Sequence, residues 1–218
     1  IQYLKMLPIK TTVIDKVEAD DIIAVLSKKL VEKHNSTCFI VSSDKDFVQL
    51  VTDKIILYRP MEKEYYNSET VKEKFGVLAE NFILYKTLLG DNSDKIPGVK
   101  GLGEKGIFKK FPELQTEVLT LEDIFDISAR KFKEHVVYSR IVQDRNKLEN
   151  SYKIMDLSVP MVDQQQIEYL DYLIDEKFPD LNNKLFIQLY NEDKLGGMIR
   201  NLDIWLKEKF YHFKGYKD

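Results

Sequence analysis

The sequence is poor in cysteine: Cys38 is the only one among 218 residues, and it lies within an apolar run. A single thiol excludes a disulfide-stabilised scaffold and fits a reducing compartment. We therefore expect a cytoplasmic protein. No apolar run approaches the ~18 residues that a membrane-spanning helix needs, so we expect no membrane partner.

An excess of positive charge is also missing, because 33 basic residues face 36 acidic ones and the net charge is -3. This balance excludes a strongly basic protein that coats nucleic acid. It does not exclude a nuclease, because the metal site of such an enzyme is itself a cluster of acids. The three histidines, His34, His135 and His212, lack the spacing of metal ligands.

The first third of the chain alternates between strand and helix patterns. Short apolar or β-branched runs predict strands at 11–14, 37–41 and 55–58, the second of them buried. Apolar residues at helical spacing predict a helix that follows the segment 15–21 and runs to about Lys33, and a short helical stretch should end near Leu50. This order indicates a parallel sheet, whose ligand sites gather beyond the carboxyl ends of its strands.

After residue 69 the strand patterns disappear. Helices are expected at about 80–89, 104–111, 129–149, 164–177, 183–190 and 195–210. With 44% hydrophobic residues, the chain can build one sizeable core or two small ones. We place a boundary near Gly76, which gives an α/β part at 1–75 and a helical part at 76–218.

A glycine-punctuated loop lies between two of the predicted helices. Glycine permits positive φ angles and the close approach of a phosphate, and the amides that open the next helix would point at that phosphate. The alternative is an ordinary turn, although G-V-x-G-x-G-x-K is more specific than a lone G-x-G. The candidate DNA-binding residues are Gly98, Val99, Lys100, Gly101, Gly103, Lys105, Lys109 and Lys110.

Seven acidic residues form three groups that are suited to hard cations. Mg²⁺ and Mn²⁺ prefer oxygen ligands, and phosphodiester hydrolysis with two metal ions needs several converging carboxylates. Each group also has a structural alternative: helix capping for the first, and turn or loop formation for the other two. The groups are Glu18 with Asp20 and Asp21, Asp44 with Asp46, and Asp91 with Asp94.

The order of these motifs resembles that of the 5′-nuclease, or flap endonuclease, superfamily. Gly90-Asp91-x-x-Asp94 followed by Ile96-Pro97-Gly98-Val99-x-Gly101-x-Gly103-x-Lys105 is most similar to phage 5′-3′ exonucleases of the ribonuclease H type and to the 5′-nuclease domain of DNA polymerase I. The resemblance implies part of a parallel-sheet, PIN-like α/β nuclease core. A helical domain should follow, with a helix–three-turn–helix DNA-binding element at about 79–111.

The resemblance also implies roles for the candidate residues. Glu18, Asp20 and Asp21 match ligands of a first metal site, and Asp44, Asp46, Asp91 and Asp94 match ligands of a second. The two ions would be Mg²⁺ or Mn²⁺, and carbonyls of the glycine loop would hold K⁺. The implied reaction is 5′-3′ exonuclease or flap endonuclease cleavage of flap or branched duplex DNA and of RNA/DNA hybrids such as RNA primers.

One departure from the family pattern concerns the start of the chain. The family places two further aspartates and a basic arch upstream of Glu-x-Asp-Asp, whereas only 17 residues precede Glu18 and the first residue is not methionine. We therefore expect a fragment, complemented by a missing N-terminal segment or subunit and weak or inactive alone. The alternatives are a non-catalytic duplex DNA-binding module or the complementing half of a split nuclease. A Toprim-type enzyme ranks last, because its glutamate directly follows a strand.

Overall fold

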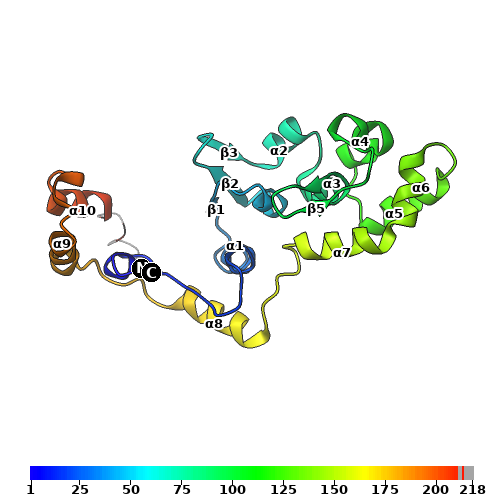
Figure 1. Ribbon diagram of the computed structural model, residues 1–218. Helices are drawn as coiled ribbons and strands as arrows, with labels where there is room; N and C mark the ends of the chain where they lie inside the picture. The colour runs from blue at the N-terminus through cyan, green and yellow to red at the C-terminus, as the bar shows by residue number, and fades with distance from the viewer. Residues whose placement is uncertain (211–212, 214–218) are drawn as a thin grey trace. The chain divides into compact units, whose positions relative to one another are not determined.

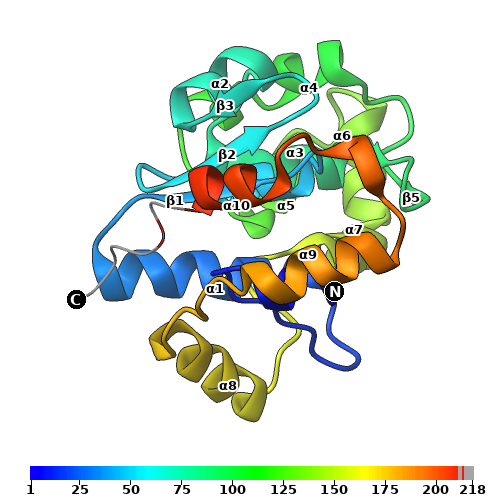
Figure 2. The same cartoon turned by 90° about the vertical axis from the view of Figure 1, so that its left-hand side faces the viewer.

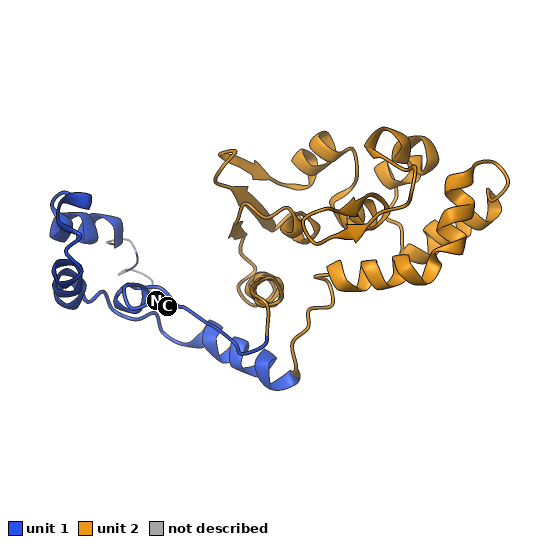
Figure 3. Ribbon diagram, viewed as in Figure 1, with its two compact units in different colours: residues 1–16, 164–218 blue, residues 17–163 orange. Residues whose placement is uncertain are grey.

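The computed structural model describes residues 1–210 and 213. Residues 211, 212 and 214–218, which include His212 and the end of the predicted helical part, lie outside the described residues. The chain forms two compact units, Val17–Asp163 and Ile1–Lys16 with Gln164–Asp218 (Figure 3). The boundary expected near Gly76 falls inside the larger unit, and the division into parts 1–75 and 76–218 stays a prediction.

The larger unit contains a three-stranded sheet in the order β1 (Cys38–Val41), β2 (Ile55–Arg59) and β3 (Glu64–Tyr66). β1 and β2 are parallel, as the sequence predicts, and β3 adds an antiparallel strand that was not predicted. The helix α1 (Ala19–His34) precedes β1 and packs against it (Figure 1). The predicted strand at 11–14 is wrong, because these residues form neither helix nor strand.

β1 is also more exposed than its composition suggests. It lies at the edge of the sheet, and Ile40 is its only buried residue, whereas Phe39 is 54% and Val41 is 65% exposed. Successive side chains of a strand point to opposite faces, so Ile40 faces the core and its two neighbours face away from it. The prediction of a buried strand therefore holds for one face only.

Short helices make up the rest of the larger unit: α2 (Ser68–Phe75), α3 (Phe82–Leu89), α4 (Glu104–Lys110), α5 (Leu121–Arg130), α6 (Val136–Gln143) and α7 (Arg145–Met155), with 3-10 turns η2 (Asp46–Leu50), η3 (Ala79–Asn81) and η4 (Pro112–Gln115). The single helix predicted at 129–149 is wrong. The Nδ1 atom of His135 accepts the amide of Val137 at 3.2 Å and so caps the start of α6, which separates it from α5.

α3 crosses the core of the larger unit and packs against α7 (Figure 1). Every residue from Phe82 to Leu88 is buried, as expected for a helix that is apolar nearly all round. The helix stops at Gly90, whose φ of +83° favours glycine. Two short antiparallel strands follow, β4 (Gly90–Asp91) and β5 (Ile96–Pro97), in a region where no strand was predicted.

The smaller unit consists of η1 (Leu4–Met6), α8 (Gln164–Asp175), α9 (Asn183–Glu192), η5 (Gly196–Met198) and α10 (Leu202–Phe210), which Figure 2 shows in yellow to red apart from the blue η1. Its core contains Leu7, Phe186, Tyr190 and Leu206. The Nζ atom of Lys10 donates to the carbonyls of Leu173 and Ile174, which ties the start of the chain to the end of α8. None of the helices in the described part of the chain has the length and apolar character of a membrane span.

Candidate metal centre

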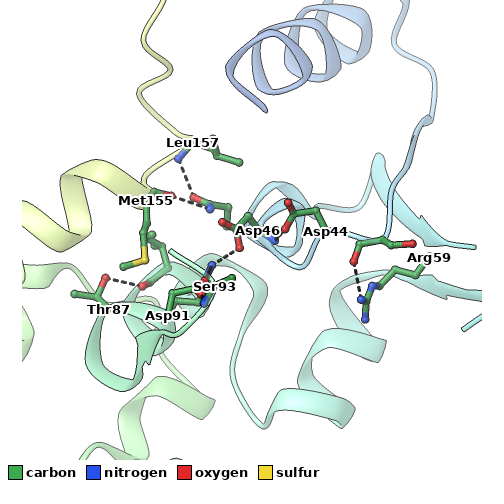
Figure 4. Close-up of polar contacts among 12 residues, drawn as sticks. Asp44, Asp46, Arg59, Thr87, Asp91, Ser93, Met155 and Leu157 are labelled. Atoms are coloured by element: carbon green, nitrogen blue, oxygen red, sulfur yellow. Dashed lines mark hydrogen bonds and ion pairs between the residues drawn. The ribbon is translucent and has the colours of Figure 1, made fainter. Parts of the chain in front are cut away.

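Three of the predicted metal ligands meet in the larger unit. Asp46 opens η2, Asp91 lies in β4, and Asp94 lies in the hairpin that joins β4 to β5. One carboxylate oxygen from each lies within 4.8 Å of the other two, and Asp94 is the exposed member. Figure 4 shows Asp46 and Asp91 on neighbouring segments. An all-oxygen set of this kind fits a hard cation such as Mg²⁺ or Mn²⁺.

A buried lysine contacts two of these carboxylates. The Nζ atom of Lys86, on α3, forms ion pairs with Asp46 and with Asp91, the latter at 2.6 Å. Lys86 is only 8% exposed, so its charge depends on these partners. The ammonium group shows that the carboxylates stabilise a positive charge here, which supports their fit to a metal cation.

The three charged groups around Lys86 have shifted acidities. Burial raises the pKa of Asp46, although hydrogen bonding and charge attraction from Lys86 partly oppose the shift. Burial also opposes ionisation of Asp91, but hydrogen bonds from Lys86 and Ser93 hold the pKa of Asp91 well below its usual range. Burial alone would lower the pKa of Lys86, and the two carboxylates outweigh burial and raise it.

Asp44 lies outside the group of three. The hydroxyl of Ser42 accepts the amide of Asp44 at 3.0 Å, and a carboxylate oxygen of Asp44 accepts the amide of Asp46 at 2.9 Å. These bonds shape the turn that leads from β1 to η2. The structure therefore gives Asp44 a local structural contact, and its role as a fourth ligand stays a prediction.

The acids of the first predicted group lie at the start of α1. Glu18 is the N-cap residue of α1, but its side chain makes no capping hydrogen bond, so the alternative of helix capping is wrong for Glu18. Asp21 is buried, and its Oδ1 atom accepts the amide of Met161 at 2.9 Å. Burial, together with the charges of Asp44 and Asp46, raises the pKa of Asp20.

The glycines of the loop serve different purposes. Of the three loop glycines, Gly101 alone uses the positive φ that glycine permits, at +83°. Position 98 has room only for glycine, because a Cβ atom there would lie 2.1 Å from the carbonyl oxygen of Leu89. Gly90 faces it, and a Cβ atom on Gly90 would lie 2.2 Å from the amide nitrogen of Gly98. Gly103 is extended and has nothing within 4 Å of its Cβ position.

The other candidate DNA-binding residues differ in exposure. Lys100, Lys105 and Lys109 are exposed and Lys110 is half-buried. Val99 is buried, with 7% exposed, so its side chain packs in the core rather than facing a ligand.

Three basic residues near the candidate site were not singled out from the sequence. Arg140 donates from Nη1 to the carbonyl of Lys100 at 2.6 Å and so braces the glycine loop from α6. Lys86 and Arg59 line a cavity of ≈ 550 Å³ with Asp44, Asp46 and Asp91. Lys86 had one local signal, a charge that interrupts an apolar helix. Arg59 and Arg140 had none, because the carbonyls of Ser43 and Lys100 that they contact are distant in the sequence.

Comparison with known proteins shows relatives along most of the chain. Residues 1–76 match the family described as 5′-3′ exonuclease, N-terminal resolvase-like domain. DNA polymerase I of Bacillus subtilis (strain 168) is 42% identical over 125 residues, covering 56% of this chain and 14% of that protein. The 5′-3′ exonuclease of Aquifex aeolicus (strain VF5) is 30% identical over 205 residues, covering 93% of this chain and 64% of that protein.

A similar fold is found in the flap endonuclease of bacteriophage T5, solved as a pseudo-enzyme–product complex with DNA and metal ions. The TM-score is 0.62 at 23% sequence identity, and the match covers 76% of this chain and 61% of that one. The chain thus spans less than two thirds of the length of each of these relatives.

Proposed function

Because this chain is related to the 5′-3′ exonucleases and flap endonucleases, we propose that it carries a metal-dependent nuclease site that cuts flap DNA or RNA primers from the 5′ end. The observation that supports this most directly is the cluster of Asp46, Asp91 and Asp94 around a buried cationic group. The relationship accounts for the order of the motifs, and the cluster supplies the oxygen ligands that the reaction needs.

The residues have distinct roles in this proposal. Asp46, Asp91 and Asp94 hold one Mg²⁺ or Mn²⁺ ion, with Asp44 as a further ligand, and Glu18, Asp20 and Asp21 hold a second. Divalent ions lower the pKa of bound water and neutralise charge on the phosphate that is cut. Lys86 keeps Asp46 and Asp91 ionised and close together, because its ammonium group pairs with both. No side chain of the chain needs to act as a nucleophile.

The loop from Gly98 to Lys105 is proposed to hold the duplex backbone without reading its sequence, with K⁺ bound by loop carbonyls. The exposed Lys100 and Lys105 suit phosphate contacts, and such contacts weaken steeply with salt. Gly103→Val tests this directly, because the open space at Gly103 accommodates the larger side chain without a clash. Duplex affinity should fall in Gly103→Val at unchanged stability. Unchanged affinity would mean that the loop is only structural.

We also propose that the 218-residue chain cuts slowly when it acts alone and that a further polypeptide segment completes the first metal site. The basis is the resemblance, which places two more aspartates in that site, together with the small number of acids at the start of α1. Each missing electrostatic element commonly costs ~10²-fold in rate. A segment supplied in trans from a longer relative should then raise the rate of the chain.

The test is cleavage of a 5′-labelled flap duplex in Mg²⁺ by the chain, with and without such a segment. Cleavage should require metal, stop with EDTA and be lost in Asp91→Asn, while the matched surface change Asp144→Asn leaves it intact. Cleavage that survives both EDTA and Asp91→Asn would overturn the proposal. Salt-sensitive duplex binding with no cleavage under any condition would instead support the non-catalytic DNA-binding module.

A further inference from the structure

Arg59, the last residue of β2, is a buried cation whose contacts lead to the acidic cluster. Only 6% of the residue is exposed. Its Nη2 atom donates to the carbonyl of Ser43 at 2.8 Å (Figure 4). Its Nη1 atom pairs with Glu62 at 2.9 Å. The ring of Tyr66 lies 5.6 Å from the guanidinium group, so the side chain is fixed from three directions.

The bond to Ser43 holds the turn that presents Asp46. β1 and β2 are parallel, so both strands end at the same edge of the sheet, and Tyr58 pairs with Val41 just before that edge. Beyond it, the guanidinium group anchors the turn at Ser43, and the hydroxyl of Ser42 fixes the amide of Asp44. A carboxylate oxygen of Asp44 then fixes the amide of Asp46. The position of Asp46 is thus linked to Arg59 through consecutive backbone contacts.

Stability does not explain why a charged residue occupies this place. A buried ion pair contributes little net stability, because removing both charges from water offsets their attraction. The Nε atom of Arg59 is buried without any hydrogen-bond partner, which adds a further cost. An apolar side chain of similar length would fill the same space without these costs.

We propose that Arg59 is a positioning residue for the metal centre: it holds the Ser42–Asp46 turn so that Asp46 meets Asp91 and Asp94. This inference rests on the proposed function, because it assumes that the cluster binds a divalent ion. Groups that orient metal ligands without touching the metal typically change metal affinity 10–100-fold when they are removed. Arg59 is such a group, acting through backbone atoms rather than through the ligand carboxylates.

Electrostatics alone makes the opposite prediction, which allows a clear test. Removing a positive charge near a cation site reduces repulsion and should strengthen metal binding. Loss of the anchor should weaken it, because Asp46 then samples positions away from its two partners. Weaker Mn²⁺ binding after removal of Arg59 therefore reports on geometry and cannot be an effect of charge.

The experiment is calorimetric titration of the full chain with Mn²⁺, well below its unfolding temperature. Arg59→Met should bind Mn²⁺ about 10-fold or more weaker than wild type, with an unchanged urea midpoint. The matched control is Lys74→Met. Lys74 also lies over the ring of Tyr66, at 5.1 Å, and pairs with Glu64 rather than with the turn. This control should bind Mn²⁺ within about twofold of wild type, because it removes a charge but no anchor.

Arg59→Lys keeps the charge and one donor for the Ser43 carbonyl, so this variant should bind Mn²⁺ more tightly than Arg59→Met. If Arg59→Met fails to fold, Arg59→Lys still allows the test. Equal or tighter Mn²⁺ binding by Arg59→Met, or equal weakening by Lys74→Met, would overturn the inference alone. A wild-type chain that binds no Mn²⁺ would overturn the proposed function, and the inference with it.

Discussion

The larger unit contains two sets of acidic residues, and the fold holds these two sets in different ways. Asp46, Asp91 and Asp94 come from segments far apart in sequence, and a buried lysine pairs with two of them. Glu18, Asp20 and Asp21 follow one another at the start of α1, and within the described residues no ion pair involves Glu18 or Asp20.

This difference shows what each kind of site requires of the fold. Acids in the first turn of a helix are tolerated without a counter-ion, because the helix dipole and solvent favour negative charge there. Acids that the fold gathers from distant segments repel one another and lose water, so the metal-free chain needs its own cation among them. Lys86 supplies that cation for the set formed by Asp46, Asp91 and Asp94, because it pairs with Asp46 and Asp91.

Removing this cation should have the largest effect. Lys86→Met leaves Asp46 and Asp91 half-buried and without their cationic partner, and breaking a buried pair costs up to roughly 3–5 kcal/mol. Urea unfolding in EDTA should show this loss, and saturating Mn²⁺ should restore more stability to the variant than it adds to wild type. Lys45→Met is the matched control, because Lys45 lines the same cavity but is exposed, and it should change stability by less than about 0.5 kcal/mol.

The pH dependence of the stability difference between wild type and Lys86→Met provides a second check on the pairing of Lys86. The pKa of Lys86 is raised in the folded chain, so its contribution is complete below the unfolded value of about 10.4 and is lost as pH rises through the folded value. The stability difference between wild type and Lys86→Met should stay constant from about pH 6 to 9 and narrow only as pH rises beyond the unfolded value. A difference that disappears below pH 9 would contradict the pairing.

Asp21 offers a smaller effect that separates structure from metal binding within the first group. Asp21→Ala removes the acceptor of the Met161 amide and should destabilise the chain by roughly 1.5–3 kcal/mol. Asp21→Asn keeps an acceptor oxygen and should lose less. Urea unfolding of both variants in EDTA measures this. If Asp21→Ala is as stable as wild type and loses only Mn²⁺ affinity, Asp21 is a ligand without a structural role.

The smallest expected effect compares one acid from each group directly. Asp94 is exposed, so Asp94→Asn should preserve the fold while it removes one charged ligand and weakens Mn²⁺ binding about 10-fold. Glu18→Gln should change the tighter Mn²⁺ site by less than about threefold, because the first group is not gathered around it. Calorimetric titration measures both, and an equal loss in the two variants would mean that the two groups form one site.

Local patterns were enough to predict the parallel pair of strands and to mark the acids as candidates, whereas the resemblance was needed to join Asp44, Asp46, Asp91 and Asp94 into one predicted site. Asp91 and Asp94 are three residues apart, and Asp46 lies in the short turn that follows β1, so both signals lie within a few residues. The pairing of Lys86 with Asp46 was not predictable in this way, because the two residues are 40 positions apart and only the packing of α3 brings them together. The contacts of Arg59 with the Ser43 carbonyl and of Arg140 with the Lys100 carbonyl were not predictable for the same reason.

The wrong predictions also have local physical causes. The helix expected at 129–149 breaks because an imidazole nitrogen of His135 caps α6, and histidine is not among the usual capping residues. The strand at 37–41 was expected to be buried because apolar composition does not tell which face of an edge strand the core covers.

The backbones of Gly90 and Gly98 cross in close contact. This crossing links the proposed metal site, which contains Asp91, to the proposed duplex-binding loop. The two backbones touch there, and Gly90 pairs with Pro97 while Asp91 pairs with Ile96, so the intervening hairpin cannot slide. The crossing therefore holds Asp91 close to the proposed duplex-binding loop. In the proposed nuclease, a side chain added at Gly90 or Gly98 would push the two backbones apart and shift Asp91 relative to that loop, so the position of the cut should change with it.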